Sequence, residues 1–231
     1  MQLSKRLETI AACIPQNAII ADIGTDHACL PVYLVQKGVC PRAVAGDLNT
    51  GPVKSARNMV KSRGLENRIE IRQGDGLEIL KPGEVDVVIM AGMGGELMAR
   101  LLAEGRDKIK SVQRLLLQPN NNAWNVRSWL AENGWGIIDE HLVKERGKFY
   151  PVIISEQGRG LFAADSLSLE VGPFLLQKGG PLVKELLEQK SENYAAILEG
   201  LSKSKDPSLS RKKKVIKELL QGIKGELERG C

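Results

Sequence analysis

The chain has 231 residues, of which 42% are hydrophobic and 26% charged, a composition typical of a globular protein with room for one large domain or one ordinary domain and an appendage. No apolar run approaches the ~20 residues that a membrane-spanning helix needs, and the N-terminus carries no apolar leader segment. The net charge of +5 is mild, so only its distribution along the chain can favour a nucleic-acid partner.

Cysteine and histidine are scarce. The four cysteines form no Cys-x-x-Cys pair and there are only two histidines, which argues against a structural zinc site and against a disulfide framework. We therefore expect no metal and a reducing, cytoplasmic environment. The sequence leaves the oligomeric state open, with a monomer favoured.

A helix over residues 3–14 and a buried strand over 18–21 precede the most informative stretch, ADIGTDHA at residues 21–28. A buried strand that breaks at Asp-x-Gly-x-Asp and leads into a helix is typical of the ligand site of open α/β sheets. Gly24 allows a tight turn close to a ligand. Asp26 stands where a dinucleotide site has its second glycine. A carboxylate there would repel a pyrophosphate but suits an amine or sulfonium, which among common cofactors describes S-adenosylmethionine (SAM). The alternative is an ordinary strand-helix turn with acidic caps.

Two further acidic residues follow the next two predicted strands. The strand over 43–47 ends in Asp47, near the ~20 residues beyond the glycine turn expected for an acid that binds ribose hydroxyls. The alternative for Asp47 is a helix cap. The strand over 69–72 leads to Asp75 and Gly76, where the acid can accept from the amine of adenine, although a plain turn also fits.

The fourth predicted strand, over 85–90, is continuously apolar after Asp86, as in a strand buried on both faces. It ends in a glycine-rich loop at 91–95, which allows close approach of a ligand or simply packs against a helix. The fifth strand, over 115–117, leads to the amide cluster 118–122. Amides can read the edge of a base, although Asn and Pro also favour turns and helix caps.

The last part of the predicted sheet is a pair of strands over 136–143 and 149–155. No helix separates them, so they predict an antiparallel hairpin at the sheet edge. Five parallel strands with such a hairpin indicate the α/β class I SAM-dependent methyltransferase arrangement, a Rossmann-like sheet, rather than the plain dinucleotide-binding one.

The composition changes after residue 158. Two apolar stripes at helical spacing predict an antiparallel helical hairpin that resembles a coiled coil. We therefore expect a SAM-binding domain over 1–158 and a helical domain over 159–231. Basic residues that could follow a phosphate backbone gather around the connection of the two helices, although a solvated helix end would look the same. These candidate RNA-binding residues are Lys203, Lys205, Arg211, Lys212, Lys213 and Lys214.

Five segments carry a family resemblance when they are taken together: ADIGTDHACLP, AGDLN, RQGDGLEIL, VVIMAGMGGELM and LLLQPN. In this order and spacing they resemble the TrmK family of bacterial tRNA (adenine-N1)-methyltransferases, which modify adenine 22 of tRNA. The resemblance covers essentially the whole chain, most closely residues 1–157. It implies SAM as the methyl donor, tRNA as the substrate, and a class I fold with a C-terminal helical appendage.

Carried over by position, the resemblance assigns the cofactor to residues at the strand ends. These candidate cofactor-binding residues are Asp22, Gly24, Asp26, Asp47, Leu48, Asn49, Asp75, Gly76, Ala91, Gly92, Met93 and Gly94. The first strand would meet the methionine end, the second the ribose and the third the adenine, with the transferable methyl over the glycine-rich loop. One departure is Cys29, at a position where family members often have an aromatic residue.

The chemistry requires positioning more than acid–base catalysis. Neutral adenine keeps a lone pair on N1 in the ring plane, so it can attack the methyl group directly, and no proton has to leave during the attack. Alignment alone can supply ~7–11 kcal/mol of the barrier. A paired adenine must first leave its stack. We expect Asn120 to hold the base, with His27 and Asp26 as further catalytic candidates, although a histidine beside a cofactor turn is often only part of the scaffold.

Three alternatives stay open from the residues alone. The enzyme could methylate another RNA nucleotide, the sheet could serve a nicotinamide-dependent oxidoreductase, or the chain could be a non-catalytic RNA-binding protein. Asp26 and Ala28 at the phosphate-facing glycine positions disfavour the oxidoreductase. The absence of an Asn-Pro-Pro-aromatic motif favours methylation of a ring nitrogen over an exocyclic amine.

Overall fold

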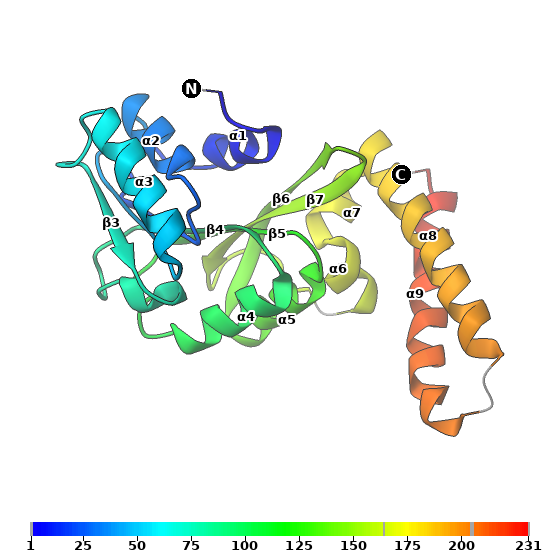
Figure 1. The fold of residues 1–231 in the computed structure, drawn as a ribbon. Coiled ribbons are helices and arrows are strands. Elements are labelled where there is room, and N and C mark those ends of the chain that lie inside the picture. Colours follow the sequence, from blue (N-terminus) through cyan, green and yellow to red (C-terminus); the bar gives the residue numbers. More distant parts are fainter. Residues whose placement is uncertain (1, 164, 204–205, 231) are drawn as a thin grey trace.

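The computed structural model describes residues 2–163, 165–203 and 206–230, so the candidate Lys205 lies outside it. Within these residues seven strands form one sheet in the order β3-β2-β1-β4-β5-β7-β6 (Figure 1). The strands are β1 (Ile20–Ile23), β2 (Ala43–Asp47), β3 (Ile69–Gln73), β4 (Val87–Met93), β5 (Arg114–Pro119), β6 (Trp135–Glu145) and β7 (Lys148–Gln157). The first five are parallel, and β7 pairs antiparallel with both β5 and β6. The predicted fold class and edge hairpin are confirmed.

The first strand differs from its predicted range of 18–21. Hydrogen-bonded neighbours on both sides keep the backbone extended to Ile23, which pairs with Gly46 of β2 and Met90 of β4. The turn therefore begins at Gly24, and Asp22 lies inside the buried strand rather than after it.

Helices cover both faces of the sheet (Figure 1). One face carries α1 (Lys5–Ala12), α2 (Cys29–Gln36) and α3 (Thr50–Ser62), and the other carries η1 (Gly76–Ile79), α4 (Gly95–Glu104) and α5 (Ala123–Glu132). Strand β4 shows why its sequence is continuously apolar. Val87 and Ile89 pack in the first core, Val88 and Met90 pack in the second, and none of the four is more than 1% exposed.

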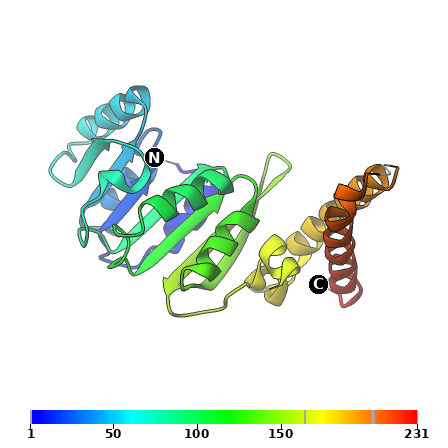
Figure 2. The same cartoon turned by 90° about the horizontal axis from the view of Figure 1, so that it is seen from below.

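The C-terminal part contains α6 (Ser166–Val171), α7 (Pro173–Lys178), α8 (Pro181–Ser202), η2 (Pro207–Leu209) and α9 (Ser210–Glu228). The long helices α8 and α9 form the predicted antiparallel hairpin, which extends away from the sheet (Figures 1 and 2). A third core joins them to α6 and α7. The sequence did not predict α6 and α7, because six residues are too few to show a helical period.

A buried ion pair fastens the sheet to these helices. Arg127 of α5 and Glu140 of β6 are both fully buried, with 2.9 Å between Nε and Oε1. The same guanidinium donates to the carbonyl oxygens of Leu169 and Val171 at the end of α6, each at 2.9 Å. Glu140 accepts from the backbone N–H of Phe174 in α7, at 3.0 Å. One ion pair thus satisfies the end of one helix and the start of the next.

The domain division at residue 158 stays a proposal. Arg159 bridges to Glu156 and Leu161 to Ile137, so the first residues beyond that point still follow the sheet. Among the helices of the described ranges, none is long and apolar enough to cross a membrane.

Candidate active site

A cavity of about 260 Å³ lies where β1 to β4 end at their carboxyl edge. The lining brings together nine of the twelve predicted cofactor-binding residues: Gly24, Asp47, Leu48, Asn49, Asp75, Gly76, Ala91, Gly92 and Met93. Asp22, Asp26 and Gly94 do not line it. The lining also includes six residues that the sequence reasoning missed: Ile23, Gly46, Gly74, Leu97, Arg100 and Leu101. Leu97, Arg100 and Leu101 are at positions i, i+3 and i+4 of α4 and therefore share one face of the helix, a spacing that could have indicated them from the sequence.

Asp47 is held by its own loop. Its Oδ1 accepts from the backbone N–H of Asn49 at 2.8 Å and from Nδ2 of the same residue at 3.2 Å. Asn49, not Asp47, is the N-cap of α3, so the helix-cap alternative is wrong. Within the described residues Oδ2 has no hydrogen-bond partner and remains available to a hydroxyl of a ligand in the cavity.

Two leucines give the cavity apolar walls. Leu48 is 57% exposed and Leu97 is 41% exposed, unusually high values for large aliphatic side chains. Both line the cavity together with Asp75 and the glycines of three loops. This combination of apolar walls and a carboxylate suits a flat, largely apolar ring that carries hydrogen-bonding edges.

The turn after β1 is tight because Gly24 has a φ of +77°, and a Cβ at this residue would lie 3.0 Å from Cε of Met93. Thr25 accepts from the N–H of Ala28 through Oγ1 at 3.1 Å. Behind the turn, burial raises the pKa of Asp22 to about 6, against the lowering effect of a hydrogen bond with Thr25. Asp22 therefore lies inside the strand and contacts the turn through its hydrogen bond with Thr25.

Asp26 and His27 lie together at the surface. Nε2 of the histidine is 3.2 Å from Oδ2 of the aspartate, and their side chains are 55% and 76% exposed. Their cofactor and catalytic roles stay predictions. At the neighbouring Cys29, burial and then the Asp22 and Asp26 carboxylates raise the pKa of the thiol, which keeps it neutral.

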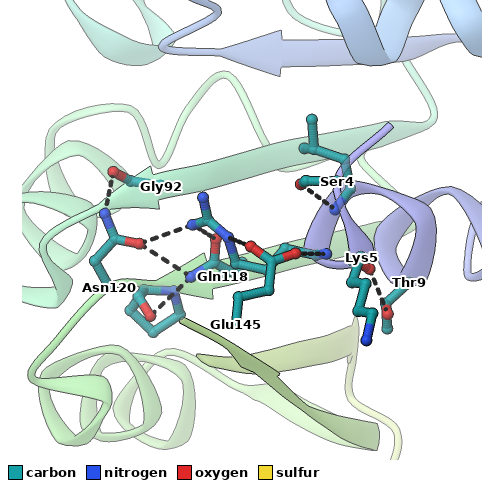
Figure 3. A network of polar contacts seen from close by, with 10 residues as sticks. Ser4, Lys5, Thr9, Gly92, Gln118, Asn120 and Glu145 are labelled. Carbon is teal, nitrogen blue, oxygen red and sulfur yellow. Dashed lines mark hydrogen bonds and ion pairs between the residues drawn. The ribbon is translucent and has the colours of Figure 1, made fainter. Parts of the chain in front are cut away.

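Asn120 is joined to the glycine-rich loop (Figure 3). Its Nδ2 donates to the carbonyl oxygen of Gly92 at 2.5 Å. Its backbone N–H donates to the carbonyl oxygen of Met93 at 2.8 Å. Its Oδ1 accepts from Arg6 Nη1 at 3.1 Å and from Gln118 Nε2 at 3.3 Å. The amide oxygen is thus occupied, and one N–H of the side chain remains to be offered to a substrate.

Arg6 of α1 organises this network. Its Nη1 also donates to Gln118 Oε1 at 3.0 Å, its Nε donates to Glu145 Oε2 at 3.1 Å, and its guanidinium lies 4.5 Å from the ring centroid of Tyr150. Gln118 is only 1% exposed inside β5, so within the predicted amide cluster 118–122 it cannot reach the edge of a base. The sequence reasoning missed Arg6 because its partners lie more than 100 residues along the chain.

The basic residues gather at the far end of the helical hairpin. Lys203 caps the C-terminus of α8, and the other described candidates are Arg211, Lys212, Lys213 and Lys214 in the first turns of α9. No acidic residue lies in the first turn of α9, where positive charge opposes the helix dipole. The helix dipole therefore does not explain this charge, although Lys214 also forms an ion pair with Glu218 within α9.

Comparisons with known proteins agree on one family. The family model described as "TrmK: tRNA (adenine(22)-N(1))-methyltransferase" matches residues 20–225. The chain is 41% identical over 223 residues to the tRNA (adenine(22)-N(1))-methyltransferase of Bacillus subtilis, covering 95% of this chain and 93% of that protein.

Solved structures of similar proteins match over the full length of the chain. The crystal structure of the B. subtilis M1A22 tRNA methyltransferase TrmK is 38% identical, covers 97% of this chain and 98% of that one, and gives a TM-score of 0.91. A putative tRNA (m1A22) methyltransferase of Streptococcus pneumoniae in complex with S-adenosyl-L-methionine is 36% identical, covers 98% of this chain and 100% of that one, and gives a TM-score of 0.87.

Proposed function

Since the chain belongs to the TrmK family of tRNA (adenine(22)-N(1))-methyltransferases, we propose that the cavity at the ends of β1 to β4 holds SAM and that Asn120 holds the adenine that is methylated. The protein is a SAM-dependent enzyme that methylates N1 of adenine 22 in tRNA. The observation that carries the site assignment is the hydrogen bond between Asn120 and Gly92, which connects the cofactor cavity to the amide loop.

The residues of the cavity fit this cofactor. Asp47 offers Oδ2 to the ribose hydroxyls, and Asp75 offers a carboxylate to the amine of adenine. Leu48 and Leu97 are the walls for the adenine ring. An acid at the place of Asp47 would also suit the ribose of a dinucleotide, so the family match is what counts against the oxidoreductase alternative.

The catalytic work of the chain is positioning. Bound SAM supplies a methyl group on a sulfonium, which the lone pair of adenine N1 can take by in-line displacement. Asn120 can donate but not accept, because Arg6 and Gln118 occupy its Oδ1. A donor aimed at N1 would block the lone pair, so we expect Asn120 to bind another acceptor of the flipped-out adenosine and leave N1 free.

The basic end of the helical hairpin supports contact with tRNA, since its positive charge opposes the dipole at the start of α9 and a phosphate backbone would attract it. Lys205 completes this set in the sequence but lies outside the described residues. The proposal includes a monomer in the cytoplasm.

Calorimetry with SAM and with NAD tests the cofactor assignment. We expect wild-type protein to bind SAM and not NAD, and Asp47→Asn to weaken SAM at least tenfold because the ribose loses a charged acceptor, a loss of ~1.5–3 kcal/mol. Glu132→Gln on α5 outside the cavity serves as the control and should bind SAM like the wild type. Unchanged SAM affinity in Asp47→Asn would reject the assigned cavity.

Kinetics of Asn120→Ala test the base-holding role. We expect turnover of tRNA to fall while the affinity for SAM stays close to that of the wild type, because Asn120 borders the cavity without lining it. Loss of SAM binding together with turnover would assign Asn120 to the cofactor instead.

A further inference from the structure

A second, larger cavity of about 530 Å³ lies between the sheet and the helical hairpin. Asn120 to Asn125 form one side, the β6–β7 hairpin contributes Phe149, and α8 contributes Lys190 and Tyr194. The volume is in the range of sites for small organic groups, ~300–1,000 Å³. Both parts of the chain are needed to form it.

The cleft borders the catalytic position. Asn120 lines the cleft, while Gly92, to which its side chain is bonded at 2.5 Å, lines the cofactor cavity. A polynucleotide that places one nucleotide at Asn120 therefore has the cleft immediately beside it.

Three amide residues line this cleft without a structural hydrogen bond. Within the described part of the chain, the side chains of Asn121, Asn122 and Asn125 form no hydrogen bond. They offer donors and acceptors next to one another. Unengaged amides around a cavity can bind the polar edge of an unpaired base.

Trp124 supplies a surface for stacking. The other two tryptophans, Trp129 and Trp135, are buried in the second core, but Trp124 is only partly buried, belongs to none of the three cores of the described residues, and lines the cleft. Its ring is thus not needed to fill the interior. An accessible aromatic ring beside free amides is the combination that holds single-stranded nucleotides.

The opposite wall is polar and already paired. Lys190 forms an ion pair with Glu170, and burial followed by the Glu170 carboxylate raises the pKa of Tyr194. With its charges paired, this wall does not attract a free anion, whereas a neutral base can enter the cleft.

We propose that this cleft binds an unpaired nucleotide of the tRNA next to the methylated adenosine, with its base stacked on Trp124 and its edge bonded to Asn121, Asn122 or Asn125. The proposal rests on the proposed function, because it takes tRNA as the substrate. It places this contact beside the active site, separate from the basic end of the hairpin.

The test uses the full-length enzyme, unmodified tRNA transcripts and the variants Trp124→Ala and Trp124→Phe. Loss of one stacked base corresponds to about a 5- to 150-fold change in binding. We therefore expect Trp124→Ala to raise KM for tRNA at least about fivefold with unchanged SAM affinity, and Trp124→Phe to retain most of the affinity. Phe162→Ala, an exposed aromatic outside the cleft, should match the wild type.

A fluorescent base identifies the nucleotide. Transcripts with 2-aminopurine at position 21 or 23 should show quenching at one of the two positions on binding, and Trp124→Ala should abolish it. Asn125→Ala is a second variant, and it should raise KM in the same direction. Unchanged KM in both variants, or no quenching at either position, would overturn the proposal. Failure of the wild type to methylate adenine 22 would instead refute the proposed function.

Discussion

Asp22 shows how a single buried carboxylate links the sheet to the site. It lies inside β1, where burial raises its pKa to about 6, and a hydrogen bond with Thr25 connects it to the turn that Gly24 begins. The sequence identified the residue as important but placed it after the strand. Burial of this kind depends on the strands that pair on both sides, which a local apolar run does not reveal.

The raised pKa makes stability depend on pH. The folded protein binds this proton more tightly than the unfolded chain does, so the stabilisation is full below pH ~4 and is lost as the pH rises through about 6. Asp22→Asn removes this dependence. We expect the variant to gain about 2–3 kcal/mol over the wild type between pH 4 and pH 7, measured by urea unfolding at each pH. A difference that stays constant over this range would contradict the assignment.

The hydrogen bond from Arg6 to Asn120 is the second feature at the scale of single residues. Because Arg6 fixes which way the amide points, we expect Arg6→Met to lower kcat by a factor on the order of 10², as a misplaced catalytic group does, with the affinity for SAM unchanged. The double variant Arg6→Met/Asn120→Ala should be no slower than the slower single variant, since both remove one function.

Arg114 provides the matched control for Arg6. It also joins α1 to the sheet, through Cys13 O at 3.1 Å and Glu156, but it lies at the other end of the helix. Arg114→Met should therefore leave kcat unchanged. Equal losses in the two arginine variants would show that α1 matters only as scaffold, and additive losses in the double variant would separate Arg6 from Asn120.

At the scale of elements, the buried pair of Arg127 and Glu140 holds α5, β6, α6 and α7 together. We expect Arg127→Met to destabilise the protein by about 3–5 kcal/mol, because Glu140 would keep its charge without a partner. Denaturant unfolding measures this. Lys110→Ala, which removes an exposed ion pair with Asp107, should have no measurable effect. A small loss in Arg127→Met would mean that Glu140 finds water or a proton instead.

The basic end of α9 is proposed to contact the tRNA. Replacing Arg211, Lys212 and Lys214 by alanine should weaken tRNA binding and reduce its salt dependence by ~0.7–0.9 in log–log slope per lost phosphate contact. Thermal stability should change little, because these charges oppose the helix dipole and the Lys214–Glu218 pair that is lost is exposed. The triple variant Lys54→Ala/Lys61→Ala/Arg63→Ala at α3 is the control. An unchanged salt dependence of tRNA binding in the α9 variant would show that these residues do not contact tRNA phosphates.

The sequence predicted the elements of the sheet well because β1, β2, β4 and β5 contain short apolar runs, and each run is followed by a chemically distinct loop. Acids at the ends of β1, β2 and β3 indicated one site, and the strand order brings those ends side by side. The short helices α6 and α7 and the contact of Arg6 with Asn120 were missed. The helices are too short to show a helical period, and the Arg6 contact joins residues 114 positions apart, which no local pattern encodes.

At the scale of the whole molecule, the sheet and the C-terminal helices are joined by buried hydrogen bonds and a shared core, and not only by the chain that connects them. A chain cut after residue 159 would lose the carbonyl oxygens that Arg127 binds and the third core that packs on Leu142 and Phe149. The loss of activity in such a truncation would therefore report on folding as well as on tRNA contact. Point variants at the cleft and at the basic end separate these causes.

At the centre of all these predictions, the chain moves a methyl group from SAM to N1 of adenine 22 in tRNA. The most direct measurement combines labelled SAM, an unmodified tRNA transcript and mapping of the modified nucleotide by mass spectrometry. We predict one methyl group per tRNA, located on N1 of adenine 22, and none on a transcript with guanine at that position. Methylation of another nucleotide, or none with the wild-type enzyme, would contradict the account.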